Sequence, residues 1–195
     1  MAMDFLFQLD RIKEAPLRIE REISLGDLRE ILSAEPPTGY VALEAARFAG
    51  TLTRVDERDI VFEGGTSLEL ATSCRRCLGR AELHVDVRFT LDLVNRARVS
   101  ERMAEVIEDD GTGEIAGTFT PDEADQVLYE GTEVDLAPVV REQILLALPM
   151  SALCSEGCLG LCQVCGQNLN EDACACDRHV PDPRWAALRS IKLPK

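Results

Sequence analysis

The eight cysteines of this sequence fall into four closely spaced pairs, and a pair of thiolates is a common half of a tetrahedral metal site. In chain order the pairs are Cys74/Cys77, Cys154/Cys158, Cys162/Cys165 and Cys174/Cys176. One tight turn can direct two thiolates at one ion, and a second pair can complete its shell. The four pairs therefore predict two four-thiolate sites with Zn²⁺ as the cofactor.

The separation of the pairs along the chain suggests how they group. The third pair is followed by Gly166 and has the form of a zinc knuckle, in which the glycine adopts a backbone conformation that other residues resist. Only eight residues separate Cys165 from Cys174, so the third and fourth pairs can form one local site. The first and second pairs would then share the other ion. A swapped grouping, in which the second and third pairs share an ion, is also sterically reasonable.

Disulfides and redox couples are the alternatives to metal binding. The segment Met1–Gln8 lacks the basic and long apolar stretches of a secretory signal, so we expect a reducing cytoplasm, where disulfides are rare. A thioredoxin-like couple opens a helix, whereas a strand-like pattern follows Cys77. Metal ligation is therefore favoured, while redox or iron–sulfur chemistry stays open.

Catalytic motifs are missing from the sequence. It contains no nucleophile elbow, no phosphate-binding glycine loop and no H-E-x-x-H helix. We expect His84 and His179 to be surface residues or supports of the metal ligands. A zinc ion with four thiolate ligands keeps no position for water and serves structure. The sequence therefore predicts a protein that is not an enzyme.

The strands that position the first cysteine pair can be read from periodicity. Apolar and polar residues alternate strictly from Leu83 to Leu93, which predicts a half-buried antiparallel strand. We expect it to pair with Thr66–Thr72, so that the first cysteine pair lies at the tip of the connecting hairpin. Further strands are predicted at Leu17–Ile23, Val41–Val55, Ile60–Phe62 and Gln126–Tyr129. Glycines inside these runs, Gly50, Gly64 and Gly65, are expected at bulges or turns.

Three helices are predicted from their start and stop signals. A short helix is expected at Leu25–Leu32. Asp135 can cap a second helix that carries a wide apolar face and stops at Pro149. A short basic closing helix is expected to begin at Asp182 and to reach Leu188.

These elements predict an α+β fold, with a mainly antiparallel β-sheet, a packing helix and a C-terminal zinc-knuckle module. With 195 residues and 46% hydrophobic content, the chain can bury a sizeable core. We expect one α+β domain over residues 1–150, with an acidic insertion at about 101–125. Residues 151–195 would form the cysteine-rich module and the closing helix. No apolar run approaches the roughly 20 residues that span a bilayer, so we expect a soluble protein without a membrane partner.

The formal charge of −14 is unevenly distributed. Between Glu101 and Asp135 there are twelve acidic residues and one basic residue. The first cysteine pair and the C-terminal tail are instead rich in arginine and lysine, and such side chains can contact phosphate. The candidates for nucleic-acid binding are Arg75, Arg76, Arg80, Arg178, Arg184, Arg189 and Lys192.

A succession of motifs from about residue 70 to 192 resembles one known family. The motifs are Cys74-x-Arg76-Cys77-Leu78, Val134-Asp135-Leu136 leading to Leu148-Pro149, Gly160-Leu161-Cys162-x-x-Cys165-Gly166, Leu169-Asn170, Cys174-x-Cys176 and Asp182-Pro183-Arg184. They are similar to those of the YceD family, the large ribosomal RNA subunit accumulation proteins. The resemblance implies a non-enzymatic ribosome biogenesis factor that supports 23S rRNA accumulation and large-subunit assembly. Its expected partner is 23S rRNA or a pre-large-subunit particle.

Two other functions stay open at this point. A zinc-dependent or thiol-redox enzyme would need an open metal position or a cysteine with a strongly lowered pKa. A protein–protein adaptor could instead use the acidic segment to capture a basic large-subunit ribosomal protein. The chain departs from the family pattern at Gln163, where proline is common, and this change leaves the thiolates intact.

Overall fold

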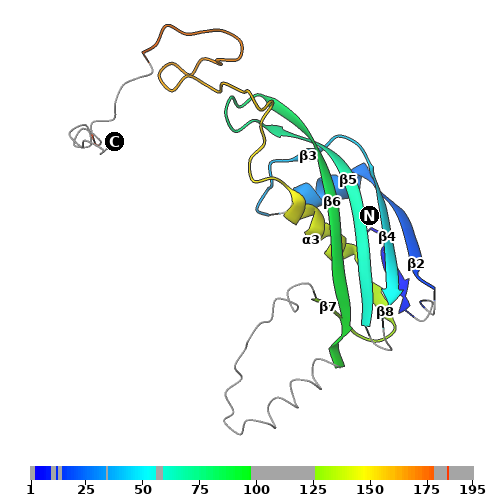
Figure 1. The fold of residues 1–195 in the computed structure, drawn as a ribbon. Helices are drawn as coiled ribbons and strands as arrows, with labels where there is room; N and C mark the ends of the chain where they lie inside the picture. Colours follow the sequence, from blue (N-terminus) through cyan, green and yellow to red (C-terminus); the bar gives the residue numbers. More distant parts are fainter. Residues whose placement is uncertain are drawn as a thin grey trace, which may run out of the picture. The chain divides into compact units, whose positions relative to one another are not determined.

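The computed structural model describes residues 3–9, 12, 15–33, 35–55, 59–97, 126–177 and 184 (Figure 1). The chain divides into two compact units. The sheet unit comprises residues 1–72 and 82–150, and the cysteine unit comprises residues 73–81 and 151–195. The predicted acidic insertion lies outside the described residues, as does the predicted closing helix apart from Arg184.

The sheet unit contains a six-stranded sheet in which five strands follow the order β2-β4-β5-β6-β7. Its strands are β2 (Leu17–Ile23), β3 (Val41–Ala42), β4 (Ala46–Arg54), β5 (Asp59–Ser73), β6 (Arg80–Asn95) and β7 (Gln126–Tyr129). β4 pairs antiparallel with β2 and β5, the short β3 pairs antiparallel with β5, and β7 runs parallel to β6. Two further strands, β1 (Leu6–Gln8) and β8 (Glu133–Asp135), form a separate antiparallel pair.

The described residues of this unit also include two helices. In α1 (Leu25–Leu32), the Ser24 hydroxyl accepts a hydrogen bond from the Asp27 N–H at 3.1 Å. In α3 (Ala137–Ala147), the N-cap residue is Leu136 and not the predicted Asp135, which ends β8, although the Asp135 carboxylate accepts a hydrogen bond from the Ala137 N–H at 2.9 Å. The predicted α+β class, with a mainly antiparallel sheet, is therefore confirmed.

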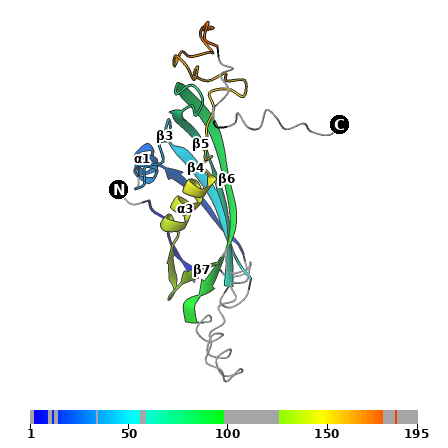
Figure 2. The ribbon, with the colours of Figure 1, turned by 90° about the vertical axis from the view of Figure 1, so that its left-hand side faces the viewer.

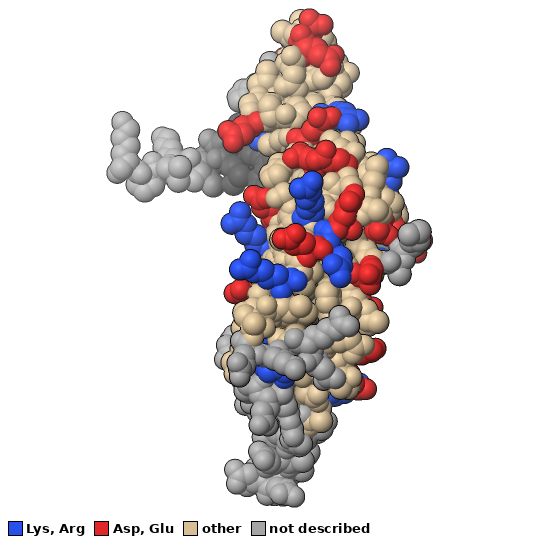
Figure 3. Space-filling model, turned by 90° about the vertical axis from the view of Figure 1, so that its right-hand side faces the viewer, with Lys and Arg blue, Asp and Glu red and all other residues tan. Residues whose placement is uncertain are grey.

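The hydrophobic core lies between the sheet and the two helices. Figure 2 shows α1 and α3 on one face of the sheet. Alternation along β6 buries Val85, Val87, Leu91 and Leu93, as the period of two predicts. The other face is solvated, and Figure 3 shows acidic and basic side chains intermixed over the described part of the surface drawn there.

The prediction of bulges or turns at Gly50, Gly64 and Gly65 is wrong. β4 and β5 pair in one continuous register through all three positions. A Cβ atom on Gly64 would lie 2.6 Å from Phe48 Cζ and 2.9 Å from Phe89 Cζ. The glycine is therefore needed because aromatic rings cross the backbone there, which is the usual reason for glycine inside a strand.

Five of the six phenylalanines form the aromatic part of this core. The Phe5 and Phe48 rings meet edge to face with centroids 5.2 Å apart. Phe62 and Phe89 do the same, also at 5.2 Å. Such geometry brings the positive edge of one ring to the negative face of another.

The described helices include none long and apolar enough to cross a membrane.

Replacing Gly64 by alanine should lower the free energy of unfolding by about 1–3 kcal/mol, because the added methyl group overpacks the aromatic core. Chemical denaturation measures the change. Gly26→Ala is the matched control, since the atom nearest to its added Cβ is Ser24 Oγ at 3.6 Å and alanine favours helix. The control should leave stability unchanged or raise it. A Gly64→Ala protein as stable as the original chain would contradict this account of the core.

Candidate metal centres in the cysteine unit

The eight thiols of the cysteine unit form two tetrads. The first tetrad comprises Cys74, Cys77, Cys154 and Cys158, and the second comprises Cys162, Cys165, Cys174 and Cys176. Within each tetrad the sulfur atoms lie within 4.8 Å of one another. The structure thus groups the first cysteine pair with the second and the third with the fourth, and the swapped grouping is not the one observed.

The distances between sulfur atoms suit a metal ion better than a disulfide. Cys74 Sγ lies 3.8 Å from Cys158 Sγ, and Cys77 Sγ lies 3.6 Å from Cys154 Sγ. A disulfide bond is about 2.0 Å long. A tetrahedral ion with metal–sulfur bonds of about 2.3 Å separates its ligands by about 3.8 Å. Each tetrad could therefore hold one metal ion with four protein ligands.

Two segments of the cysteine unit, the first knuckle (residues 73–81) and the second knuckle (residues 162–167), share one backbone hydrogen-bond pattern. In the first knuckle, the Cys74 N–H donates to the Gly79 carbonyl at 2.7 Å and the Leu78 N–H donates to the Cys74 carbonyl at 3.0 Å. The equivalent bonds in the second knuckle run from Cys162 to the Gln167 carbonyl and from Gly166 to the Cys162 carbonyl, both at 2.8 Å. The two knuckles are therefore copies of one turn.

Both knuckles also contain a residue with positive φ directly after the second cysteine. In the second knuckle this residue is Gly166, with φ 76°, which confirms the conformation predicted for it. In the first knuckle it is Leu78, with φ 59°. Nothing in the sequence indicates this conformation, because a leucine in the left-handed region is unusual.

Residues 151–161 dock on the first knuckle through backbone hydrogen bonds. The Arg75 N–H donates to the Ala152 carbonyl at 2.9 Å, and the Leu161 N–H donates to the Arg76 carbonyl at 3.0 Å. A Cβ atom on Gly160 would lie 3.0 Å from that Arg76 carbonyl oxygen, so only glycine permits this close approach. These contacts deliver the second cysteine pair to the first tetrad.

The Arg76 side chain contributes to the same docking. Its Nη1 donates to the Cys158 carbonyl at 2.9 Å and approaches the Glu156 carbonyl at 3.4 Å. Arg76, one of the seven basic residues predicted to bind nucleic acid, therefore helps to hold residues 151–161 on the first knuckle. Arg75, Arg76, Arg80 and Arg184 are all exposed, whereas Arg178, Arg189 and Lys192 lie outside the described residues.

Asn170 supports the ligands of the first tetrad from the loop that follows the second knuckle. Its Nδ2 donates to Cys158 Sγ at 3.4 Å, and its Oδ1 accepts from the Leu159 N–H at 2.7 Å. The same Nδ2 lies 2.8 Å from Asn168 Oδ1. The sequence assigned no role to Asn170, although an amide side chain near thiolate ligands is a common signal of ligand support.

The surroundings of the sulfur atoms favour the thiolate form of the first cysteine in each knuckle. Backbone N–H groups of Cys154 and Cys77 lower the pKa of Cys74 to about 6. The N–H groups of Cys165 and Val164 lower the pKa of Cys162 to about 6 in the same way. Cys74 and Cys162, the first cysteines of the two knuckles, therefore ionise readily, as metal ligation requires.

Crowding of the thiols has the opposite effect on two other cysteines. The neighbouring Cys158 thiol raises the pKa of Cys154 to about 12. The Cys165 thiol does the same to Cys176, whose pKa rises to about 12. Like charges this close repel, so entry of a cation favours loss of the protons of Cys154 and Cys176.

The two knuckles differ in burial and in charge. Three cysteines of the first tetrad are buried, whereas only Cys162 is buried in the second. Residues 73–81 contain three arginines and no acidic residue. Residues 162–177 contain Glu171, Asp172 and Asp177 and no lysine or arginine. The same turn thus carries basic side chains in the first knuckle and is followed by acidic side chains after the second.

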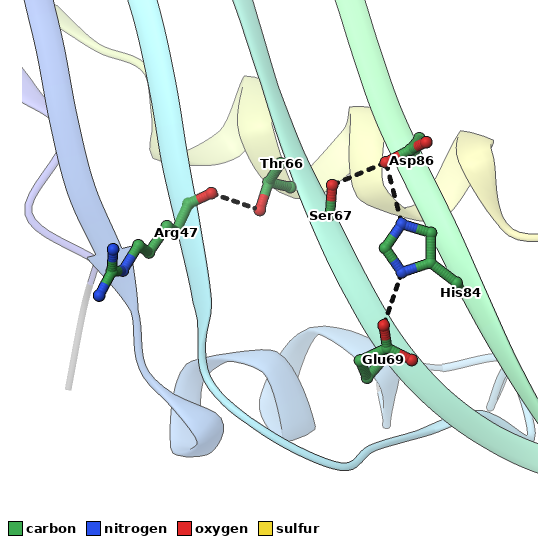
Figure 4. Close-up of polar contacts among 6 residues, drawn as sticks. All are labelled: Arg47, Thr66, Ser67, Glu69, His84 and Asp86. Carbon is green, nitrogen blue, oxygen red and sulfur yellow. Dashed lines mark hydrogen bonds and ion pairs between the residues drawn. The ribbon is translucent and has the colours of Figure 1, made fainter.

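A polar cluster on the sheet unit involves His84, which was predicted on the solvated face of its strand (Figure 4). His84 Nδ1 lies 2.6 Å from Glu69 Oε1, and its Nε2 lies 3.2 Å from Asp86 Oδ1. The Ser67 hydroxyl donates to the same Asp86 oxygen at 2.7 Å. The hydrogen bond to Glu69, followed by that to Asp86, raises the pKa of His84.

Comparison with known proteins gives matches to one family. The family model described as "Large ribosomal RNA subunit accumulation protein YceD" matches residues 62–192. Two chloroplastic relatives are both named "Large ribosomal RNA subunit accumulation protein YCED homolog 1". The Arabidopsis thaliana protein is 32% identical over 63 residues, which is 32% of this chain and 20% of that protein. The Zea mays protein is 40% identical over 45 residues, which is 23% of this chain and 15% of that protein.

The aligned part of the chain thus spans a fifth or less of the length of these curated relatives. No solved structure matches the chain.

Metal analysis should find two ions per chain purified under reducing conditions, one for each tetrad. Cys174→Ser should remove one ion and lower the melting temperature slightly, because the second tetrad closes a short segment. Cys74→Ser should remove the other ion and lower the melting temperature more, because residues 151–161 lose their anchor on the first knuckle. Equal melting curves for the two variants would contradict this assignment of roles.

The His84 cluster should stabilise the sheet unit in a defined pH range. Since the folded pKa of His84 is raised, its contribution is complete below the unfolded value of about 6.5 and is lost as pH rises through the folded value. The stability difference between the original chain and His84→Gln should therefore be larger at pH 5.5 than at pH 9, as urea unfolding can measure. A difference that is independent of pH would exclude this contribution.

Proposed function

The chain belongs to the YceD family, and on this premise we propose that it is a non-enzymatic ribosome biogenesis factor. It supports accumulation of 23S rRNA and assembly of the large subunit by binding the rRNA or a pre-ribosomal particle. The family model covers two thirds of the chain and includes all eight cysteines, so the metal centres belong to the matched region.

The proposal includes Zn²⁺ as the ion of both tetrads. Four thiolates in tetrahedral array are typical ligands of structural zinc. With four protein ligands, such an ion has no position for a reacting water, which supports a role in holding the fold and not in catalysis. The thiolates around each zinc would leave a formal charge of −2, and the nearby Arg76 guanidinium can offset part of it.

The single observation that supports RNA binding most strongly is the charge of the first knuckle. Its three arginines are exposed, and residues 73–81 contain no acidic side chain. A knuckle held by metal keeps Arg75 and Arg80 on a fixed backbone, so fewer conformations are lost when they contact phosphate. Arginine is the residue best suited to phosphate because its guanidinium can donate two parallel hydrogen bonds.

A second candidate function, the adaptor for a basic ribosomal protein, is favoured by the second knuckle. Glu171 and Asp172 are exposed in the segment that follows this knuckle, and residues 162–177 contain no lysine or arginine. A negative surface of this kind suits a basic partner. Both functions can coexist, because the two knuckles present different surfaces.

Removing positive charge from the first knuckle should weaken RNA binding. The double variant Arg75→Gln and Arg80→Gln should bind 23S rRNA fragments less tightly, with a salt slope reduced by about 0.7–0.9 for each lost phosphate contact. Filter binding across a salt series measures both quantities. Arg29→Gln is the control, because it removes one exposed positive charge from α1 of the sheet unit.

The proposal fails in its RNA-binding form if the intact protein associates with neither rRNA nor a precursor particle. A pull-down from lysate distinguishes the adaptor: Glu171→Gln with Asp172→Asn should then lose a basic ribosomal protein and retain rRNA affinity.

A further inference from the structure

Leu78, in the first knuckle, has a backbone conformation that its side chain disfavours. Its φ of 59° makes it the one non-glycine residue with positive φ among those that the structure describes. The left-handed region brings Cβ close to the following carbonyl oxygen, so glycine, and less often asparagine, is the usual occupant. Strain of this kind persists only where the surrounding structure imposes it, and it is concentrated at functional sites.

The second knuckle shows that the turn itself does not need a leucine at this position. Gly166 occupies the equivalent position with the same backbone hydrogen bonds and φ 76°. A Cβ atom on Gly166 would meet nothing within 4 Å, so no crowding explains the glycine there. Glycine at this position is therefore compatible with the turn, and it relieves the strain that Leu78 retains.

Packing does not explain Leu78 either. Its side chain is 67% exposed, although leucine is among the most frequently buried residues. A residue that is strained in its backbone and exposed in its side chain contributes little to the folded chain alone. A contact with a partner would account for both features.

The charge around Leu78 indicates the chemistry of that partner. Arg75 and Arg80 flank it on the same knuckle, and residues 73–81 contain no acidic residue. An apolar side chain between arginines suits a nucleotide with an unpaired base, because the base offers an apolar face and its phosphates offer negative charge. The stacked bases of a duplex do not offer that face.

We propose that Leu78 is a nucleobase contact, which packs against an unpaired base of RNA while Arg75 and Arg80 contact the adjoining phosphates. The inference rests on the proposed function and specifies the kind of RNA that the first knuckle binds. The RNA segment that this chain recognises would then be single-stranded and not part of an RNA duplex.

Leu78→Gly and Leu78→Asn separate the strain from the contact. Both residues accept positive φ, so metal content should stay at two ions and the melting temperature should be unchanged or higher. Affinity for a 12-nucleotide single-stranded RNA should nevertheless fall about tenfold, as expected for loss of a buried apolar contact. Because no phosphate contact is lost, the salt slope should not change. Affinity for the matching RNA duplex should be unaffected.

Two further variants complete the experiment. Leu78→Met keeps an apolar side chain and should bind within about twofold of the original chain. Val164→Ser is the matched control in the second knuckle, where it removes an apolar side chain that is 60% exposed. RNA affinity should be unchanged in this control, because residues 162–177 contain no basic residue.

The outcomes distinguish the inference from the function on which it rests. If the original chain binds the single strand and both Leu78 variants bind it equally well, the nucleobase contact is wrong and the proposed function stands. If the variants keep RNA affinity and lose a ribosomal protein from a pull-down, Leu78 is a protein contact and the inference is also wrong. If the original chain associates with neither RNA nor a precursor particle, the inference and the RNA-binding form of the proposed function fall together.

Discussion

The first cysteine tetrad is the constraint on which the cysteine unit depends. Four sulfur atoms within 4.8 Å of one another repel when ionised, so the arrangement requires a cation and oriented hydrogen-bond donors. Backbone N–H groups supply part of that stabilisation and lower the pKa of Cys74. Cys74 and Cys158 lie 84 residues apart in sequence, so one ion would join two distant segments of the chain. The cysteine unit is too small to be held by a large apolar core, and the ion would stabilise it instead.

The sheet unit is stabilised in the ordinary way, by burial of one face of a twisted sheet under two helices. Its distinctive feature is the fit between glycines and aromatic rings. Gly64 permits Phe48 and Phe89 to cross the strand, and any larger residue would move them. Apolar burial thus accounts for the core of the sheet unit, whereas few apolar side chains other than cysteines are buried in the described residues of the cysteine unit.

Repetition of one turn with different side chains explains how a small unit can present two surfaces. The knuckle backbone is set by hydrogen bonds between main-chain groups and by the position of its two thiolates. The remaining side chains are therefore free to vary. In the first knuckle they are arginines and Leu78, and near the second they are acids and Val164. The family relationship concerns rRNA accumulation, and the contrast between the knuckles assigns RNA to the first of them within our proposal.

The sequence by itself determined those features that depend on local periodicity and spacing. Alternation predicted β6, an apolar face that stops at Pro149 predicted α3, and loop length predicted how the cysteines group into tetrads. Tertiary structure alone decided where segments distant in sequence approach closely. The glycines inside β4 and β5, the Arg76 contact with the Cys158 carbonyl and the φ of Leu78 all depend on neighbours that no short pattern encodes. The physical reason is that periodicity is a property of one segment, whereas steric fit is a property of two.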